Sequence, residues 1–85
     1  MGRSLVFTRA AARALSRMPR NTEEWIRGKL RQLADDPSAL SNNVKALKGG
    51  DDRYRLRVGD WRVLFTIEAD RIIVHEVGPR GSIYG

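Results

Sequence analysis

Arginine alternates with apolar residues in the C-terminal half of the chain, at Arg53, Arg55 and Arg57, and an arginine recurs at Arg62. A guanidinium group keeps its charge and presents N–H donors in a planar fork that fits phosphate and carboxylate oxygens. Like charges that lie opposite each other on a sheet are destabilising, and a bound anion relieves that repulsion. The spacing therefore predicts an anion-binding surface made of arginine side chains.

A second group of such residues stands near the C-terminus, where Arg80 lies between Gly78 and Gly81 and precedes Tyr84. Glycine lets the backbone approach a ligand closely. Arginine for phosphates and an aromatic ring for base stacking are the means by which proteins bind single-stranded RNA. The charge agrees, since 16 basic and 10 acidic side chains give a net charge of +6. The alternative is that the excess charge only maintains solubility.

Metal ligands and nucleophiles are few in this sequence. Cysteine is absent and His75 is the only histidine, which excludes a disulfide framework, a thiolate nucleophile and a metal centre of several histidines. The acidic residues after Lys45 are scattered, so two-metal chemistry is not favoured and we expect no metal and no cofactor. Histidine is the residue type that most often moves protons near neutral pH, which makes His75 a possible general base. The simpler interpretation of His75 is a strand histidine held by hydrogen bonds.

A β-hairpin is predicted to position the first arginines. Apolar and polar residues alternate on both sides of Gly59 and Asp60, and glycine at the first position of a two-residue loop suits a type II′ turn. Counting outward from this loop places Arg57 opposite Arg62 on the solvent-facing side of the sheet.

A further strand is predicted over residues 71–78, which are rich in β-branched side chains. If the turn before it consists of residues 69–70, His75 lies opposite Leu64 on the same side as the arginines. The opposite face of the sheet is apolar and must be covered by the helices. Its residues are Tyr54, Leu56, Val58, Trp61, Val63, Phe65, Ile67, Ile72 and Val74.

Residues 1–85 are predicted to form a single small α+β domain, because the helical period of the first half changes to a period of two in the second half. The order β-α-α-β-β-β places both helices on one face of a mainly antiparallel four-stranded sheet. Asn21 and Glu24 resemble a capping box at the start of the second helix. In chain order we expect a strand at 3–7, helices at 8–18 and 21–35, a connecting loop at 38–52, and three strands.

No segment approaches the about 20 consecutive apolar residues of a membrane-spanning helix, and the N-terminal residues lack a signal-peptide pattern. We therefore expect a cytoplasmic protein without a membrane partner.

Three segments carry a family resemblance, KALKG, YRLRVGDWRVLF and IIVHEVGPRGSIY. In this order, after a strand and two helices, the chain resembles the RelE/ParE toxin superfamily of type II toxin–antitoxin systems over nearly its whole length. The resemblance implies a cognate antitoxin as partner. It implies one of two activities, since RelE-like members cut mRNA in the ribosomal A site and ParE-like members inhibit DNA gyrase without catalytic chemistry. A third alternative is a non-toxic member that only binds the antitoxin or DNA.

The RelE-like activity implies roles for particular residues. Arg62 matches the arginine that stabilises the phosphate, Arg80 faces the leaving group, and Tyr84 stacks on or orients the base. Arg57 completes the expected catalytic group, while RNA binding is expected from Lys45, Lys48 and Arg55.

The general base is not identified by the resemblance. Arg55 and Arg57 match positions where RelE has lysines, and arginine does not lose its proton in proteins. His75 is therefore the possible general base. Pro79 stands where relatives often carry histidine or lysine.

Contact with an antitoxin is expected on the helices. Trp25 and Met18 are plausible contact positions, as is a row of arginines at a spacing of four residues, Arg9, Arg13 and Arg17. The alternative for this row is an ordinary solvated helix face.

Overall fold

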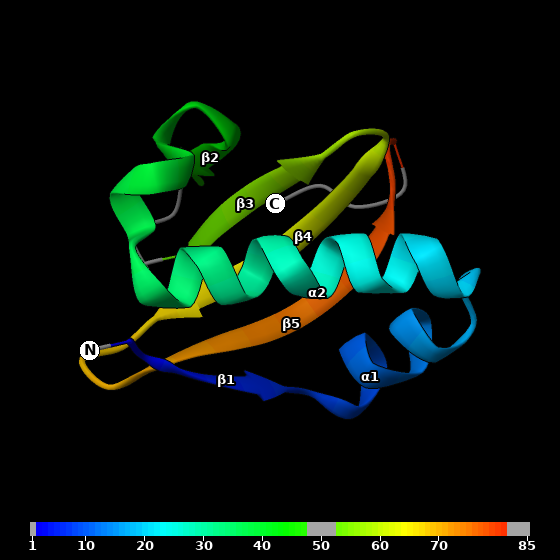
Figure 1. The fold of residues 1–85 in the computed structure, drawn as a ribbon, viewed down its shortest axis with the longest axis horizontal. Helices are drawn as coiled ribbons and strands as arrows, with labels where there is room; N and C mark the ends of the chain where they lie inside the picture. Colours follow the sequence, from blue (N-terminus) through cyan, green and yellow to red (C-terminus); the bar gives the residue numbers. More distant parts are fainter. Residues whose placement is uncertain (1, 48–52, 82–85) are drawn as a thin grey trace.

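The computed structural model describes residues 2–47 and 53–81. Helices and strands follow one another in an α+β order, as the sequence predicted (Figure 1). The elements are β1 (Ser4–Phe7), α1 (Arg9–Ser16), α2 (Arg20–Asp35), the 3₁₀ segment η1 (Pro37–Asn43), β2 (Val44–Ala46), β3 (Arg53–Val58), β4 (Trp61–Ile67) and β5 (Arg71–Pro79).

The strands form one five-stranded sheet in the order β1-β5-β4-β3-β2. β1 pairs with β5 in parallel, and the other neighbours are antiparallel. The fold class is confirmed, but the prediction of four strands was wrong by one. The predicted loop at 38–52 contains most of η1 and the short strand β2, which hydrogen-bonds to the edge of β3. A strand of three residues is too short for alternation to be recognised in the sequence.

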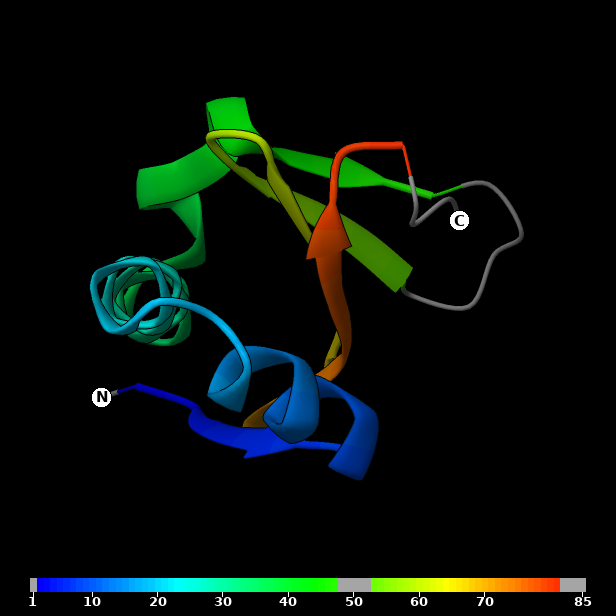
Figure 2. The same ribbon diagram turned by 90° about the vertical axis from the view of Figure 1, so that its right-hand side faces the viewer.

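The two α-helices cover one face of the sheet, and the sheet curves around α2 (Figure 2). Leu15 of α1 and Ile26 and Leu30 of α2 are fully buried against this face. Full burial of a side chain of this size contributes about 1.5–3 kcal/mol. The predicted apolar face is confirmed, since all nine of its residues lie in the core or pack against it.

Helix α2 begins earlier than the predicted capping box. Its first residue is Arg20, after Pro19 as N-cap, and no side chain caps its N-terminus. Asn21 lies inside the first turn, where its own amide oxygen accepts from the N–H of Thr22 at 3.0 Å. Helix α1 has already ended at Ser16, and the restricted φ of proline, −55° at Pro19, lets the chain enter the next helix directly.

The strand β5 contains a bulge that the sequence did not reveal. Leu64 pairs with Glu76 and Phe65 pairs with Val74, so His75 is the extra residue between the two pairs. The prediction that His75 lies opposite Leu64 was therefore wrong. A bulge sets two residues of one strand against one position of its neighbour, which simple counting cannot foresee.

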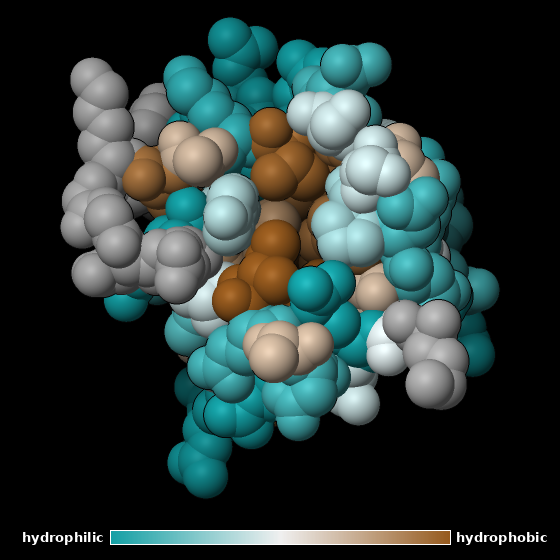
Figure 3. Space-filling view, turned by 90° about the vertical axis from the view of Figure 1, so that its left-hand side faces the viewer, coloured by the Kyte–Doolittle hydropathy of each residue, from teal (hydrophilic) through white to brown (hydrophobic). Residues whose placement is uncertain are grey.

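Apolar side chains gather in a hollow rimmed by hydrophilic residues at the end of the molecule where α2 meets η1 (Figure 3). Within residues 2–47 and 53–81, no helix is both long and apolar enough to cross a membrane.

Candidate nucleic-acid interface

Cationic side chains lie opposite one another on the face of the sheet that the helices leave open. Arg57 on β3 pairs with Arg62 on β4, as the hairpin register predicted. Lys45 on β2 pairs with Arg55 on β3. Directly opposed residues on one face have Cβ atoms about 4.5–5.5 Å apart, so this basic face concentrates positive charge at short range. We call the surface formed by five cationic residues of strands β2, β3 and β4 the basic face. Its residues are Lys45, Arg53, Arg55, Arg57 and Arg62.

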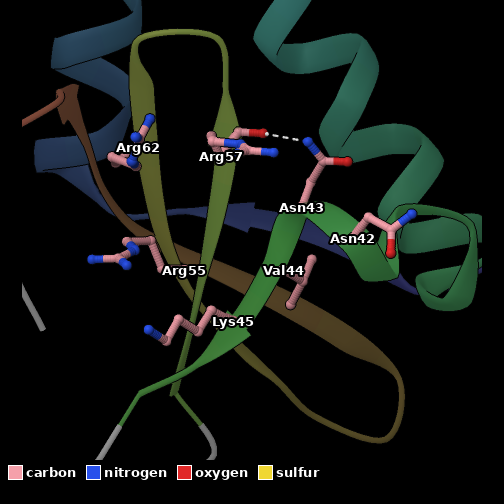
Figure 4. A pocket seen from close by; sticks show the side chains of 7 residues that line it. All are labelled: Asn42, Asn43, Val44, Lys45, Arg55, Arg57 and Arg62. Atoms are coloured by element: carbon pink, nitrogen blue, oxygen red, sulfur yellow. Dashed lines mark hydrogen bonds between the residues drawn. The ribbon is translucent and has the colours of Figure 1, made fainter.

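A surface pocket of about 210 Å³ opens on the basic face. Figure 4 shows its cationic side chains projecting from three neighbouring strands toward one side of the sheet. Three expected site residues on β3 and β4 line it, together with Lys45 and the end of η1. The lining residues are Asn42, Asn43, Val44, Lys45, Arg55, Arg57 and Arg62.

The guanidinium group of Arg62 is fixed at the tip of the hairpin. Its Nη1 donates to the carbonyl oxygens of Gly59 and Trp61, both at 3.0 Å. A guanidinium has five N–H donors, and two of them serve these bonds. Nε and Nη2 have no hydrogen-bond partner among the described residues. Arg62 is thus held by the main chain and still offers donors to a ligand.

Carboxylates do not neutralise the basic face within the described part of the chain. The ion pairs there are Arg20–Glu24, Arg27–Glu23 and Arg71–Glu68. Glu68 bonds to Arg71 at 2.6 Å, and this hydrogen bond, with the charge of Glu68, raises the pKa of Arg71. The arginines of the pocket therefore keep their capacity for an external anion.

The hairpin tip is held from two sides. Gly59 has a φ of +58°, as a tight turn led by glycine requires. The indole of Trp25 packs on it from α2, since a β-carbon built on Gly59 would lie 2.6 Å from Cη2 of Trp25. On the other side, the backbone N–H of Arg80 donates to the carbonyl oxygen of Asp60 at 2.7 Å. These contacts bring the backbone of Arg80 beside the tip where Arg62 is anchored.

His75 is not among the residues that line the pocket. Its Nε2 and the hydroxyl of Thr66 are 3.1 Å apart, and its backbone oxygen accepts from Thr8 at 2.8 Å. Thr66 lies on the same face of β4 as Arg62, four residues further along the strand. The half-buried ring is therefore held at the margin of the basic face.

Two expected site residues, Lys48 and Tyr84, lie outside the described residues. Sequence reasoning missed Asn43, which lines the pocket and whose Nδ2 donates to the backbone oxygen of Arg57 at 3.4 Å. No signal in the sequence marks it, because the contact depends on how η1 packs beside β3. Glu76 was also missed as a residue of this face, because only the bulge places it there.

Groups of His, Asp and Glu side chains that could hold a metal ion are absent among residues 2–47 and 53–81. The groups available to a ligand at the pocket are guanidinium, ammonium and amide groups. Such a set binds anions and the polar edges of bases.

Comparison with known proteins identifies relatives over nearly the whole chain. The model of the ParE toxin of the type II toxin–antitoxin system parDE matches residues 5–84. Toxin RelE3 of Methanocaldococcus jannaschii is 28% identical over 82 residues, which are 94% of this chain and 93% of that protein.

Solved structures with this fold include toxins in complex with their antitoxins. The archaeal RelE–RelB complex from Pyrococcus horikoshii OT3 has a TM-score of 0.81 at 24% identity, covering 98% of this chain and 100% of that one. The RelB–RelE complex from Methanococcus jannaschii has a TM-score of 0.68 at 26% identity, covering 93% and 94%. With the fold, the basic face and the family match in agreement, this chain belongs to the ParE toxin family of type II toxin–antitoxin systems, within the RelE/ParE superfamily.

Proposed function

We propose that this toxin is a ribosome-dependent mRNA endoribonuclease that cuts in the ribosomal A site and so inhibits translation. The observation that carries the proposal is the basic face, where Arg55, Arg57 and Arg62 share one pocket without a neutralising carboxylate among the described residues. Phosphates are the ligands that such an arrangement fits, and single-stranded mRNA supplies them at regular intervals.

The proposed reaction needs no metal. The 2′-oxygen attacks the adjacent phosphorus, the bond from phosphorus to the 5′-oxygen breaks, and the products are a 2′,3′-cyclic phosphate and a 5′-hydroxyl. The proton of the 2′-hydroxyl leaves with a base, and the 5′-oxygen receives one from an acid or water. Arg62 and Arg57 stabilise the negative charge that develops on the phosphorane, which is where preorganised donors have their largest effect.

The remaining roles are to face the leaving group, to stack on the base, to bind the RNA and to accept the proton. Arg80, whose backbone is anchored beside the hairpin tip, faces the departing 5′-oxygen. Tyr84 stacks on the base, while Lys45, Lys48 and Arg55 hold the RNA. His75 is the candidate base, because its ring nitrogen is fixed by Thr66 at the margin of the basic face. Because no carboxylate or histidine is among the described residues that line the pocket, electrostatic stabilisation and alignment supply most of the rate enhancement.

An antitoxin is the proposed protein partner, since the relatives of known structure are RelE–RelB complexes. Trp25 is a suitable contact because 48% of it is exposed on α2. Arg9, Arg13 and Arg17 form an exposed basic row at and beyond α1, which an acidic segment that folds on binding would cover. Replacing Trp25 with alanine should weaken binding of the antitoxin encoded beside the toxin, measured by calorimetry, and unchanged affinity would remove Trp25 from the interface.

DNA gyrase is the alternative target, and the match to the ParE family model favours it. In that case the basic face binds a protein and performs no chemistry. Arg62→Ala would then leave growth arrest intact, and purified toxin would inhibit supercoiling without cutting mRNA.

The test is primer extension on mRNA from a reconstituted translation reaction. Wild-type toxin should produce discrete cuts that require ribosomes, and Arg62→Ala should lower their rate by about 10²–10³. Arg31→Ala is the matched control, because it removes an exposed arginine from α2, outside the pocket. Intact mRNA with a toxin that still arrests growth would refute the proposal and favour gyrase as the target.

A further inference from the structure

Glu76 is the only acidic residue in the five strands. The bulge in β5 places it opposite Leu64, which is itself opposite Arg55 on the basic face. The row therefore runs from Lys45 through Arg55 and Leu64 to Glu76, with a carboxylate at one end and two cations at the other. Without the bulge, Glu76 would lie on the helix-covered face of the sheet.

Glu76 is exposed and lies on the same face of the sheet as the arginines of the pocket. Arg62 pairs with Gly78, which makes Glu76 its diagonal neighbour across β4 and β5. Diagonal neighbours on one face have Cβ atoms about 7–8 Å apart, within reach of one bound nucleotide. Within residues 2–47 and 53–81, no cation lies within ion-pair distance of Glu76.

A free carboxylate beside a phosphate site selects among the groups of an RNA ligand. It repels phosphates and accepts hydrogen bonds, so its partner must be an N–H or O–H donor. In RNA those donors are the amino and imino groups of bases and the 2′-hydroxyls. The choice between them follows from position.

Two strand spacings, about 9–10 Å, separate Arg55 from Glu76. A 2′-hydroxyl that attacks the phosphate must lie beside it, whereas the Watson–Crick edge of a base lies on the far side of the ribose. Glu76 is thus placed for a base edge when the phosphate occupies the pocket. Guanine is the base that offers a carboxylate two adjacent donors, N1–H and the 2-amino group.

We propose that Glu76 is a specificity-determining residue that selects guanine next to the phosphate held by the basic face. This inference rests on the proposed function only in taking RNA as the ligand. Each carboxylate oxygen accepts one hydrogen bond from guanine, and this bidentate contact compensates for the repulsion between Glu76 and the RNA phosphates.

A binding measurement tests the inference without requiring cleavage. The probes are three short fluorescent oligoribonucleotides that differ at one position, which is guanosine, inosine or adenosine. Inosine keeps N1–H and lacks the 2-amino group. Wild-type protein should bind the guanosine probe at least about fivefold more tightly than either of the others, as expected for a bidentate contact. Glu76→Gln should lose this preference and favour adenosine, because glutamine pairs in a bidentate manner with adenine.

Glu24→Gln is the control for the binding measurement, since it makes the same change on an exposed position of α2. It should keep the guanosine preference. Equal binding of the three probes by wild-type protein, or the same guanosine preference in Glu76→Gln, would overturn the inference.

Mapping of cleavage sites separates this inference from the proposed function. If Glu76 selects guanine, Glu76→Gln should still cut mRNA while its sites shift away from guanine. Loss of cleavage at every site with unchanged base preference in binding would assign Glu76 to proton transfer instead. A guanosine preference that depends on Glu76 in a protein that cuts nothing would uphold the inference and refute the nuclease.

Discussion

The two faces of the sheet are held in opposite ways. On the helix-covered face, Leu56, Val63 and Phe65 are buried, and the removal of their apolar surface from water holds them in place. On the basic face, Arg57 and Arg62 stand opposite each other with nothing in the described chain to neutralise them. The helix-covered face stabilises the fold. The basic face destabilises it through repulsion between like charges, and a bound anion would relieve that repulsion. Substitutions should therefore separate stability from activity according to the face they alter.

The largest effect on stability is expected at the centre of the helix-covered face. Phe65 is 1% exposed and stacks on Tyr54 with ring centroids 5.6 Å apart. Phe65→Ala should lower the free energy of unfolding by about 3–5 kcal/mol, because it removes apolar contacts and leaves a cavity. Denaturation in urea measures this change. A loss below about 1 kcal/mol would mean that the core repacks freely.

An intermediate effect is expected at the hairpin tip, where the two faces meet. Gly59→Ala places a β-carbon at a φ of +58° and against the indole of Trp25. The backbone strain alone costs about 1–2 kcal/mol, and the clash adds to it. In a Trp25→Ala background only the backbone part should remain. Equal losses in both backgrounds, measured by thermal denaturation, would show that the indole does not press on the turn.

A smaller effect is expected at the margin of the basic face. Thr66→Val removes the hydroxyl that lies 3.1 Å from Nε2 of His75, at almost constant volume. The loss of one partly buried hydrogen bond should lower the free energy of unfolding by about 0.5–1.5 kcal/mol. Nitrogen chemical shifts of the imidazole should also change. An unchanged ring spectrum would indicate that the ring is not held by Thr66.

The smallest effect on stability is expected from the arginine pair itself. Arg57→Ala removes an exposed side chain and relieves a repulsion, so the free energy of unfolding should change by no more than about 0.5 kcal/mol. Cleavage or RNA binding should fall much further. A loss of several kcal/mol in stability would mean that Arg57 belongs to the scaffold.

Much of this arrangement follows from local sequence. The Gly59–Asp60 loop fixes the register that pairs Arg57 with Arg62, because a two-residue hairpin leaves no freedom in the counting. The helix stripes around Ile26 and Leu30 likewise follow from helical spacing.

The parts that sequence did not predict depend on contacts between distant segments. Strand β2 exists because it adds to the edge of β3, and Asn43 reaches Arg57 only through that packing. The bulge at His75 depends on how β5 fits β4, and it changes which side chain accompanies the arginines. A register slip of one residue reverses the faces, so small errors of this kind matter most at the site.

One measurement tests most directly whether the basic face carries activity while the opposite face carries stability. It records the melting temperature and the mRNA cleavage rate of one preparation of Arg62→Ala. The melting temperature should fall by no more than about 10 °C, because the half-buried Arg62 gives up two hydrogen bonds at the hairpin tip that are each worth about 1 kcal/mol. The ribosome-dependent cleavage should fall by about 10²–10³, because the preorganised donors at the phosphate are lost. Cleavage at the wild-type rate, or a collapse of the melting temperature that accounts for the lost activity, would contradict a phosphate site on the basic face.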